Sequence, residues 1–280
     1  MVDKRGFTVD IDRVISIVQS CKDIVINNKN SDLSVVEKGN SDFVTRLDFE
    51  VQTYLRKKLM DIIPSCDFVS EEQSFNNYKS NERWILDPID GTTNLVHDYQ
   101  QLAISLAFVR ENSIEFGIIY NPFNGETFWG IKGQGAYLNG GRIYSSNETT
   151  LKSSLIAIGT SPYNKSESYR LFETIHKVFY SSQDIRRSGS AAIDIAYVAA
   201  GRTEGFFEPQ LKPWDYAAGI IILKEAGGII SNWLKSDLSL EHTDDVIATN
   251  KFIYDELIEI IQKKSLMRSW QYQQERIYSI

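Results

Sequence analysis

The first part of the chain carries apolar residues at helical spacing. Between Asp10 and Asn28 they recur every three or four positions, which predicts an amphipathic helix that Asp10 could cap. The next stretch, NNKNSDLSVVEKGNSD, is rich in Asn, Ser and Asp and predicts a loop. A second helix is predicted from about Asp48 onwards. Its apolar face would carry Val51, Leu55, Leu59 and Ile62.

The middle of the chain changes to the pattern of strands. Two short apolar runs, CDFVS and WIL, each stop at acidic residues, Glu71 and Asp87. From Leu102 to Ile143, apolar stretches alternate with the turn signals ENS, FNG and NGG, which predicts an antiparallel meander.

The remainder of the chain alternates strands with helices. We expect strands at LIAIGTS, IRRS, GFFE and DDVIATN. Helices are expected at about 166–180, over SAAIDIAYVAAG, over WDYAAGIIILKEAGG and from about Ile253. Such alternation favours a sheet layered with helices. The sequence therefore predicts an α+β part over residues 1–145 with an antiparallel sheet, and an α/β part over residues 146–280 with a mixed sheet.

Length and composition narrow the class of protein. The 280 residues are 42% apolar and 24% charged, as in folded globular chains, and suffice for one large domain or two closely packed ones. The 30 basic and 37 acidic residues give a net charge of −7, which argues against a nucleic-acid partner. The N-terminal residues lack a signal-peptide core and no apolar run could span a membrane, so a cytoplasmic protein is expected. Cys21 and Cys66 are expected to be small apolar residues without a disulfide.

The stretch WILDPIDGTTN places two carboxylates, Asp87 and Asp90, between an apolar run and a turn. Pro88 disfavours a helical conformation for Asp87, which should therefore end an extended strand. Gly91 permits a sharp turn, and the side chains of the TTN segment could cap a helix. Free N–H groups at such a turn suit phosphate oxygens. A divalent cation such as Mg²⁺ would offset the repulsion between these carboxylates and a phosphate.

A further acid, Asp215, stands in a similar setting. It lies in LKPWDYAAGIIILKEAGG, where a helix would start after Pro213 and end at a Gly-Gly pair. Together with Glu71, Asp87 and Asp90, it would complete a metal site if these distant segments converge. The alternative for each acid is a solvated or helix-capping carboxylate.

At these residues the sequence resembles the inositol monophosphatase family. Its members are Mg²⁺-dependent, lithium-sensitive phosphatases, with relatives that act on fructose bisphosphate and on nucleotide phosphates. The resemblance runs from about Lys38 to Asn250 and rests on two long motifs, DPIDGTTN and WDYAAGIIILKEAGG, with shorter matches at DFVTRLD and SEE. In SEE a serine stands where the family more often has glycine. The resemblance implies a layered α/β/α/β/α sandwich of the sugar phosphatase type.

The resemblance also implies roles for individual residues. The metal ligands, which would hold two or three Mg²⁺ ions, would be Glu71, Asp87, the backbone carbonyl of Ile89, Asp90 and Asp215. Gly91 and Thr92 would give N–H groups to the phosphate. Thr92, Asp48 and Glu71 would orient the attacking water. A metal that lowers the pKa of water and stabilises the departing oxygen fits such a set.

Substrate choice is expected to depend on the second half of the chain. The segment RRSGSAA resembles the part of the family that lines a sugar or inositol pocket. Glu208, seven residues before Asp215, matches an acid that accepts hydrogen bonds from ring hydroxyls. The alternative for Arg186 and Arg187 is a salt bridge at a strand end. The substrate-binding candidates are Asp90, Arg187, Ser190, Ala191 and Glu208.

The expected function is Mg²⁺-dependent hydrolysis of a phosphate monoester, inositol monophosphate above all, by in-line attack of a metal-activated water. Fructose 1,6-bisphosphate, 3′-phosphonucleotides and NADP are alternative substrates for the same chemistry. A regulatory binding protein with a secondary phosphatase site is the alternative from another class. The resemblance further implies a homodimer, and the C-terminal stretch LMRSWQYQQERIYSI favours a packing or dimer role.

Overall fold

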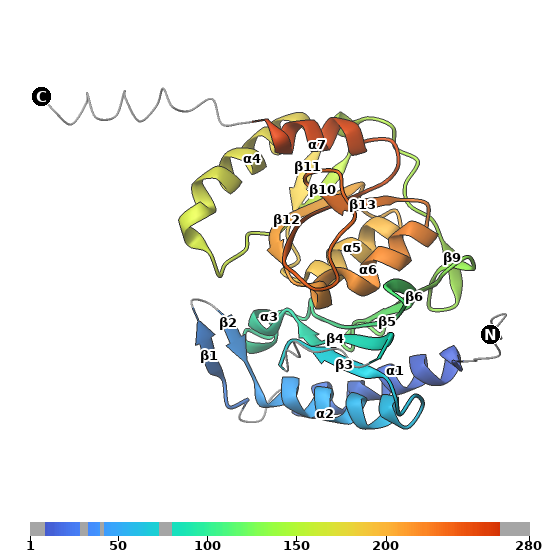
Figure 1. Cartoon of the computed structure of the whole chain (residues 1–280). Helices are drawn as coiled ribbons and strands as arrows, with labels where there is room; N and C mark the ends of the chain where they lie inside the picture. Colours follow the sequence, from blue (N-terminus) through green and yellow to red (C-terminus); the bar gives the residue numbers. More distant parts are fainter. Residues whose placement is uncertain (1–8, 29–32, 40–41, 73–79, 264–280) are drawn as a thin grey trace, which may run out of the picture.

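Helices and sheets alternate in five layers across the molecule (Figure 1). The computed structural model describes residues 9–28, 33–39, 42–72 and 80–263. Helices α1 and α2 cover one face of a seven-stranded sheet, α5 and α6 lie between this sheet and a five-stranded one, and α4 and α7 cover the far side. The predicted α/β/α/β/α sandwich is thereby confirmed. The C-terminal stretch LMRSWQYQQERIYSI lies outside the described residues.

The first layer consists of α1 (Ile11–Asn28) and α2 (Arg46–Met60), which pack against each other. The predicted spacing on α1 is confirmed, because Val14, Val18, Cys21 and Val25 are fully buried on one face. Helix α2 begins slightly earlier than expected, since Thr45 caps it: the Thr45 hydroxyl accepts a hydrogen bond from the Leu47 N–H, and the Asp48 carboxylate accepts one from the Thr45 N–H. Asp48 is therefore fixed in the first turn of a helix.

The loop expected between α1 and α2 is partly wrong. Strands β1 (Val36–Gly39) and β2 (Asp42–Val44) form a small antiparallel sheet there. The β-branched residues of this segment favour strands, and this local preference outweighs the polar composition. The NKNS part of the stretch falls mainly on residues 29–32, which lie outside the described residues.

The seven-stranded sheet has the order β3-β4-β5-β6-β7-β8-β9 and contains the predicted meander. All its neighbours pair antiparallel except β3 and β4, which are parallel, so the expected antiparallel sheet has one parallel edge. Parallel pairing of two strands requires a crossover connection rather than a tight turn. The strands are β3 (Asp67–Ser70), β4 (Glu82–Asp90), β5 (Ala103–Arg110), β6 (Ser113–Tyr120), β7 (Thr127–Ile131), β8 (Gly135–Leu138) and β9 (Gly141–Ile143).

The five-stranded sheet has the order β11-β10-β12-β14-β13 and is mixed, as predicted. Strand β13 was not foreseen, because its four residues directly follow the Gly-Gly pair that ends α6. The strands are β10 (Leu155–Ile158), β11 (Asp184–Arg186), β12 (Gly205–Leu211), β13 (Ile229–Asn232) and β14 (Asp244–Thr249). The outer helices are α4 (Ser168–Ser181) and α7 (Tyr254–Gln262), with 3₁₀ turns at Leu151–Ser153 and Lys165–Glu167.

The central layer joins the two sheets. Helix α6 (Pro213–Glu225) contacts strands of both sheets and packs against α5 (Ala191–Ala199). The approach is close: a Cβ on Gly117 of β6 would lie 2.6 Å from the Ala218 carbonyl oxygen, and one on Gly219 would lie 2.6 Å from Ile195. Both helices are almost entirely buried, and their N-terminal ends face the carboxyl end of β4. The division at residues 145 and 146 stays a prediction.

Candidate active site

The two acids of WILDPIDGTTN lie on either side of an irregularity in β4. Asp87 pairs with Ser105 of β5 and Asp90 with Ala103, so the register shifts between them. Pro88, which has no N–H group to donate, lies within this shift. The strand therefore continues past the predicted end at Asp87, and the irregularity carries both carboxylates towards the same side.

A left-handed turn follows β4 directly. Gly91 has φ +101° and is the N-cap of the short helix α3 (Thr92–Val96), so the prediction that a TTN side chain caps this helix was wrong. Only the sharp turn at Gly91 was foreseen. The first intrahelical bond comes from the Asn94 N–H to the Gly91 carbonyl, which leaves the N–H groups of Thr92 and Thr93 pointing out of the helix end.

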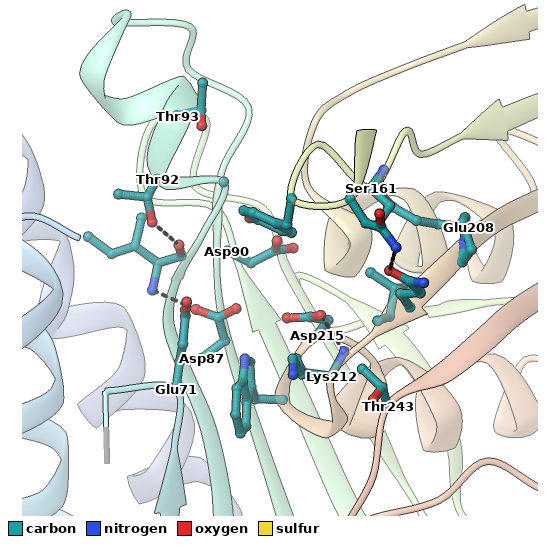
Figure 2. A pocket seen from close by; sticks show the side chains of 18 residues that line it. Glu71, Asp87, Asp90, Thr92, Thr93, Ser161, Glu208, Lys212, Asp215 and Thr243 are labelled. Carbon is teal, nitrogen blue, oxygen red and sulfur yellow. Dashed lines mark hydrogen bonds between the residues drawn. The ribbon is translucent and has the colours of Figure 1, made fainter. Parts of the chain in front are cut away.

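A cavity of about 570 Å³ opens beside this turn (Figure 2). Four carboxylates from three separate chain segments line it: Glu71 after β3, Asp87 and Asp90 in β4, and Asp215 in the first turn of α6. The predicted convergence of these acids is what the structure shows. The Ser105 hydroxyl donates to the Trp214 carbonyl oxygen at 3.1 Å and so ties the start of α6 to β5.

Burial and mutual repulsion dominate the electrostatics of this cavity. Burial raises the pKa of Asp87 well above its ordinary value, and the charges of Glu71, Asp90 and Asp215 raise it further. The pKa of Asp215 is raised for the same reasons, although the Lys212 N–H donates to its carboxylate at 2.7 Å. Within the described part of the chain, no ion pair reaches Asp87, Asp90 or Asp215.

Asp90 joins the two halves of the site. One of its carboxylate oxygens accepts a hydrogen bond from the Ser190 hydroxyl at 2.5 Å and another from the Ala192 N–H at 2.7 Å. Burial raises the pKa of Asp90 to about 6, and these hydrogen bonds act in the opposite direction. The Asn94 amide donates to the Ser188 carbonyl oxygen at 2.9 Å, which also links α3 to the segment before α5.

Asp48 and Thr92 are joined by a hydrogen bond next to the Gly91 turn. The Thr92 hydroxyl lies 3.2 Å from an Asp48 carboxylate oxygen and 3.1 Å from the Ile89 carbonyl oxygen. Asp48 is fully buried and also accepts hydrogen bonds from the Thr45 N–H at 2.8 Å and hydroxyl at 2.6 Å. Burial raises the pKa of Asp48 to about 6, so this acid can exchange a proton near neutral pH. Asp48 and Thr92, which were expected to orient the same water, are neighbours in the structure.

A second cavity of about 330 Å³ adjoins the first and shares Asp90, Glu208 and Asp215 with it. Glu208 lies on β12, and its carboxylate accepts a hydrogen bond from the Ser161 N–H at 2.9 Å (Figure 2). Burial raises the pKa of Glu208 to about 7, while the nearby charge of Arg187 lowers it. The predicted substrate residues Arg187, Ser190 and Ala191 line this second cavity.

Several lining residues were not foreseen. Ser161 holds Glu208 through its backbone, Asn94 holds the Ser188 turn, and Asp194 of α5 lines the second cavity. Backbone donors leave no signal in a sequence, whereas Asp194 could have been found as the acid of SGSAAID. Arg186 does not line either cavity and pairs with Asp184, so the salt-bridge alternative holds for Arg186 alone.

The donor set fits a hard divalent cation. Carboxylates and the Ile89 carbonyl are the oxygen ligands that Mg²⁺ prefers, and their unneutralised repulsion favours a bound cation. Within the described ranges, no three His, Cys, Asp or Glu side chains stand close enough to enclose a metal ion already. Instead, N–H and O–H groups of the protein donate hydrogen bonds to the carboxylates of Asp90 and Asp215. The structure thus gathers the donors in one cavity without assembling a coordination sphere.

Other sequence expectations have simple outcomes. Cys21 and Cys66 are buried free thiols, as predicted. In the part of the chain that the structure describes, no helix has the length and apolar character needed to cross a membrane.

The fold is a layered sandwich, and in its central cavity clustered carboxylates lie beside a turn with free N–H groups. This combination defines a phosphatase architecture. The profile of the inositol monophosphatase family matches residues 9–266, and the chain belongs to this family. The predicted resemblance is thereby confirmed.

Individual relatives differ in their described roles. The chain is 37% identical over 198 residues to the Nus factor SuhB of Escherichia coli K12, covering 70% of this chain and 74% of that one. It is 33% identical over 231 residues to a fructose-1,6-bisphosphatase/inositol-1-monophosphatase of Aquifex aeolicus, covering 82% and 86%. A crystal structure of the extragenic suppressor protein suhB from Bartonella henselae matches with a TM-score of 0.86 and 31% identity, covering 92% of this chain and all of that one.

Proposed function

We propose that this protein is a Mg²⁺-dependent phosphatase that hydrolyses inositol monophosphate to inositol and phosphate. One observation carries the proposal: a single cavity is lined by four clustered carboxylates at one end and by Glu208 at the other. The cluster suits a cation that binds phosphate, and a carboxylate such as Glu208 suits the hydroxyls of a polyol. The relative from Aquifex aeolicus, described as acting on both fructose 1,6-bisphosphate and inositol 1-phosphate, supports this substrate class.

The cluster would hold the cation with Glu71, Asp87, Asp90, Asp215 and the Ile89 carbonyl. When bound, Mg²⁺ supplies positive charge that attracts the phosphate and acidifies the attacking water. The N–H groups of the Gly91 turn, including that of Thr92, would bind phosphate oxygens. This assignment makes the sequence-predicted ligands one functional unit.

The pair formed by Thr92 and Asp48 would orient the attacking water, together with Glu71. The Thr92 hydroxyl has its proton shared between Asp48 and the Ile89 carbonyl, so its oxygen can accept a hydrogen bond from a water in the cavity. With its pKa raised to about 6, Asp48 can take up a proton near neutral pH. On the leaving-group side, Glu208, Ser190, Ala191 and Arg187 would contact the polyol.

A substrate panel tests the proposal. Phosphate release is measured from inositol 1-phosphate, fructose 1,6-bisphosphate, a 3′-phosphonucleotide and NADP, with and without Mg²⁺ and with added Li⁺. We expect the highest kcat/KM for inositol 1-phosphate, no turnover without Mg²⁺ and inhibition by Li⁺. A higher kcat/KM for one of the other esters would replace the substrate but keep the chemistry, and no release from any ester would reject the enzyme.

A regulatory role is the second candidate, because the relative from Escherichia coli is described as a Nus factor. Its test separates binding from catalysis. Cells carrying only an Asp90→Asn protein should lose function if catalysis matters. Normal growth of these cells, together with a stoichiometric protein partner recovered from them, would favour the regulatory role.

The homodimer belongs to the same proposal. Helix α4 exposes Tyr169, Phe172, Phe179 and Tyr180, a row of aromatic side chains that a second copy of the chain could cover. Light scattering on the purified protein should give twice the chain mass, and Phe172→Glu should reduce it to the mass of one chain. A monomeric wild-type protein would contradict the dimer.

A further inference from the structure

A buried acid without an assigned role lies at the back of the second cavity. Asp194 is only 4% exposed and belongs to the first turn of α5, yet it lines the 330 Å³ cavity. Its polar neighbour is Ser188, through both backbone and hydroxyl. Across the described residues, no Lys, Arg or His forms an ion pair with Asp194. The acid is therefore buried with hydrogen bonds from Ser188 and, within the described ranges, without an ion-pair partner.

The position of Asp194 in its helix does not explain its burial. A carboxylate in the first turn of a helix gains only weakly from the helix dipole. Removing a carboxylate from water costs more than this gain unless partners replace the water. Ser188 uses part of the acceptor capacity of this carboxylate, and the remaining capacity is available to a ligand that enters the cavity.

Asp194 and Glu208 line the same cavity. The two carboxylates line one cavity and interact electrostatically, since the charge of Glu208 helps to raise the pKa of Asp194, after the larger effect of burial. They come from different layers, α5 and β12, and so approach a ligand from different directions. Two acceptors in such an arrangement match neighbouring hydroxyl groups on one ring.

We propose that Asp194 is a specificity-determining residue that, with Glu208, binds adjacent hydroxyl groups of the polyol part of the substrate. The inference rests on the proposed function and extends it: the preferred esters carry free hydroxyls on neighbouring carbons, and those hydroxyls enter the 330 Å³ cavity. The cluster around Asp87 handles the phosphate, and the two acids select what the phosphate is attached to.

The test compares two esters in the Asp194→Asn protein. Inositol 1-phosphate has ring hydroxyls, whereas p-nitrophenyl phosphate has none. The ratio of their kcat/KM values should fall by roughly 10- to 100-fold, as expected for losing one buried hydrogen bond to a charged group. Glu204→Gln is the matched control, because Glu204 is a buried acid just before β12 that lines neither cavity and instead accepts the Leu155 N–H at 2.7 Å. Its ratio should equal that of the wild type.

The opposite result is equally clear. If Asp194→Asn lowers kcat/KM for both esters by the same factor, or for neither, Asp194 only supports the fold and the inference is wrong. If the asparagine variant does not fold, Asp194→Glu takes its place: it keeps the charge but adds a CH₂ that pushes the carboxylate into the cavity, and the same ratio should fall.

Binding of free myo-inositol separates this inference from the proposed phosphatase activity. Calorimetry should show weaker binding of myo-inositol to Asp194→Asn than to the wild type, by a factor similar to the loss in the kinetic ratio. Equal affinities would overturn the inference even if the enzyme is an active phosphatase. A wild-type protein that releases no phosphate but binds myo-inositol through Asp194 would reject the phosphatase and keep the polyol site.

Discussion

The two ends of the site bury acids in opposite ways. The cation end is formed by Glu71, Asp87, Asp90 and Asp215. Burial and the charges of neighbouring carboxylates raise the pKa values of Asp87 and Asp215. The hydroxyl end is formed by Glu208 and Asp194. Its Glu208 receives a backbone N–H from Ser161 and lies near the positive charge of Arg187.

This difference indicates two kinds of ligand. In the described part of the chain, no positively charged side chain forms an ion pair with Asp87, Asp90 or Asp215, so the cation end depends on an ion from solution. Acids that the protein already supplies with donors can accept further hydrogen bonds from a neutral group. The two ends therefore divide the recognition of a phosphate ester between its charged and its uncharged part, and separate substitutions should affect them separately.

The largest effect is expected at the cation end. Asp87→Asn removes the acid whose pKa four neighbouring carboxylates raise, and should lower kcat by roughly 10³-fold for every ester, because the bound cation loses a ligand and the phosphate loses its counter-charge. Phosphate release measures the loss, and circular dichroism checks the fold. Asp184→Asn, at an exposed strand end, should be indistinguishable from the wild type. A variant with normal kcat would mean that Asp87 is not part of the metal site.

Mg²⁺ should stabilise the protein through the same acids. At a concentration 100 times its Kd, an ion that binds only the folded chain adds about 2.7 kcal/mol, which corresponds to a rise in Tm of about 5–10 °C. Differential scanning fluorimetry should show this rise for the wild type and not for Asp87→Asn. An equal rise in both proteins would place the ion elsewhere.

The pH dependence of the metal-free protein follows from raised pKa values. Asp90 and Asp48 have pKa values of about 6 and Glu208 of about 7 when folded, compared with 3.8 and 4.5 for the ordinary groups. The folded chain thus binds more protons than the unfolded chain between about pH 4 and pH 7, and its stability should fall as pH rises through this window. Added Mg²⁺ should restore the part that is lost at its ligand Asp90, so the effect of Mg²⁺ on Tm should grow with pH. A constant effect of Mg²⁺ from pH 4 to pH 7 would contradict the charged-cluster account.

A smaller loss of kcat/KM is expected when a methyl group is added next to Glu208 at the hydroxyl end. A Cβ on Gly159 would lie 1.8 Å from the Glu208 carboxyl group, so Gly159→Ala must displace this acid. The kcat/KM for inositol 1-phosphate should fall by roughly 10-fold, in the range of one lost hydrogen bond. Gly141→Ala is the matched control, because its Cβ would meet nothing closer than 3.4 Å. If both variants behave alike, Glu208 does not contact the substrate.

The smallest effect concerns backbone strain beside Glu208. Gln210 adopts φ +60°, a conformation that costs a non-glycine residue about 1 kcal/mol. Gln210→Gly should therefore raise the free energy of unfolding by up to about 1 kcal/mol, measured with urea. Lys235→Gly, at φ +64° and outside both cavities, should do the same without changing KM. A rise in KM only for Gln210→Gly would show that the strained residue shapes the hydroxyl end.

The sequence predicted the cation end better than the hydroxyl end. Asp87 and Asp90 stand in one motif, and Pro88 and Gly91 constrain the backbone around them, so local rules suffice for this pair. The convergence with Glu71 and Asp215 was implied only by the family resemblance. The hydroxyl end depends on the Ser161 N–H and on the small size of Gly159, which act only after β10 and β12 have paired. Tertiary contacts of this kind leave no periodic or compositional signal.

The same distinction holds for the fold. The meander and the strand–helix alternation were predictable because each element has its own apolar period. The parallel edge at β3 and the N-cap at Gly91 were not, because strand direction and the identity of a cap depend on where the chain returns. The β1 and β2 pair shows that polar composition alone is a weak predictor of a loop.

The most direct test of the divided site is the Mg²⁺ concentration that gives half-maximal phosphate release from inositol 1-phosphate, measured for the wild type, Asp87→Asn and Glu208→Gln. We predict that Glu208→Gln lowers kcat/KM for this ester but keeps the wild-type Mg²⁺ requirement, whereas Asp87→Asn raises the requirement or abolishes release. A Glu208→Gln protein whose Mg²⁺ requirement rises as much as that of Asp87→Asn would contradict the division.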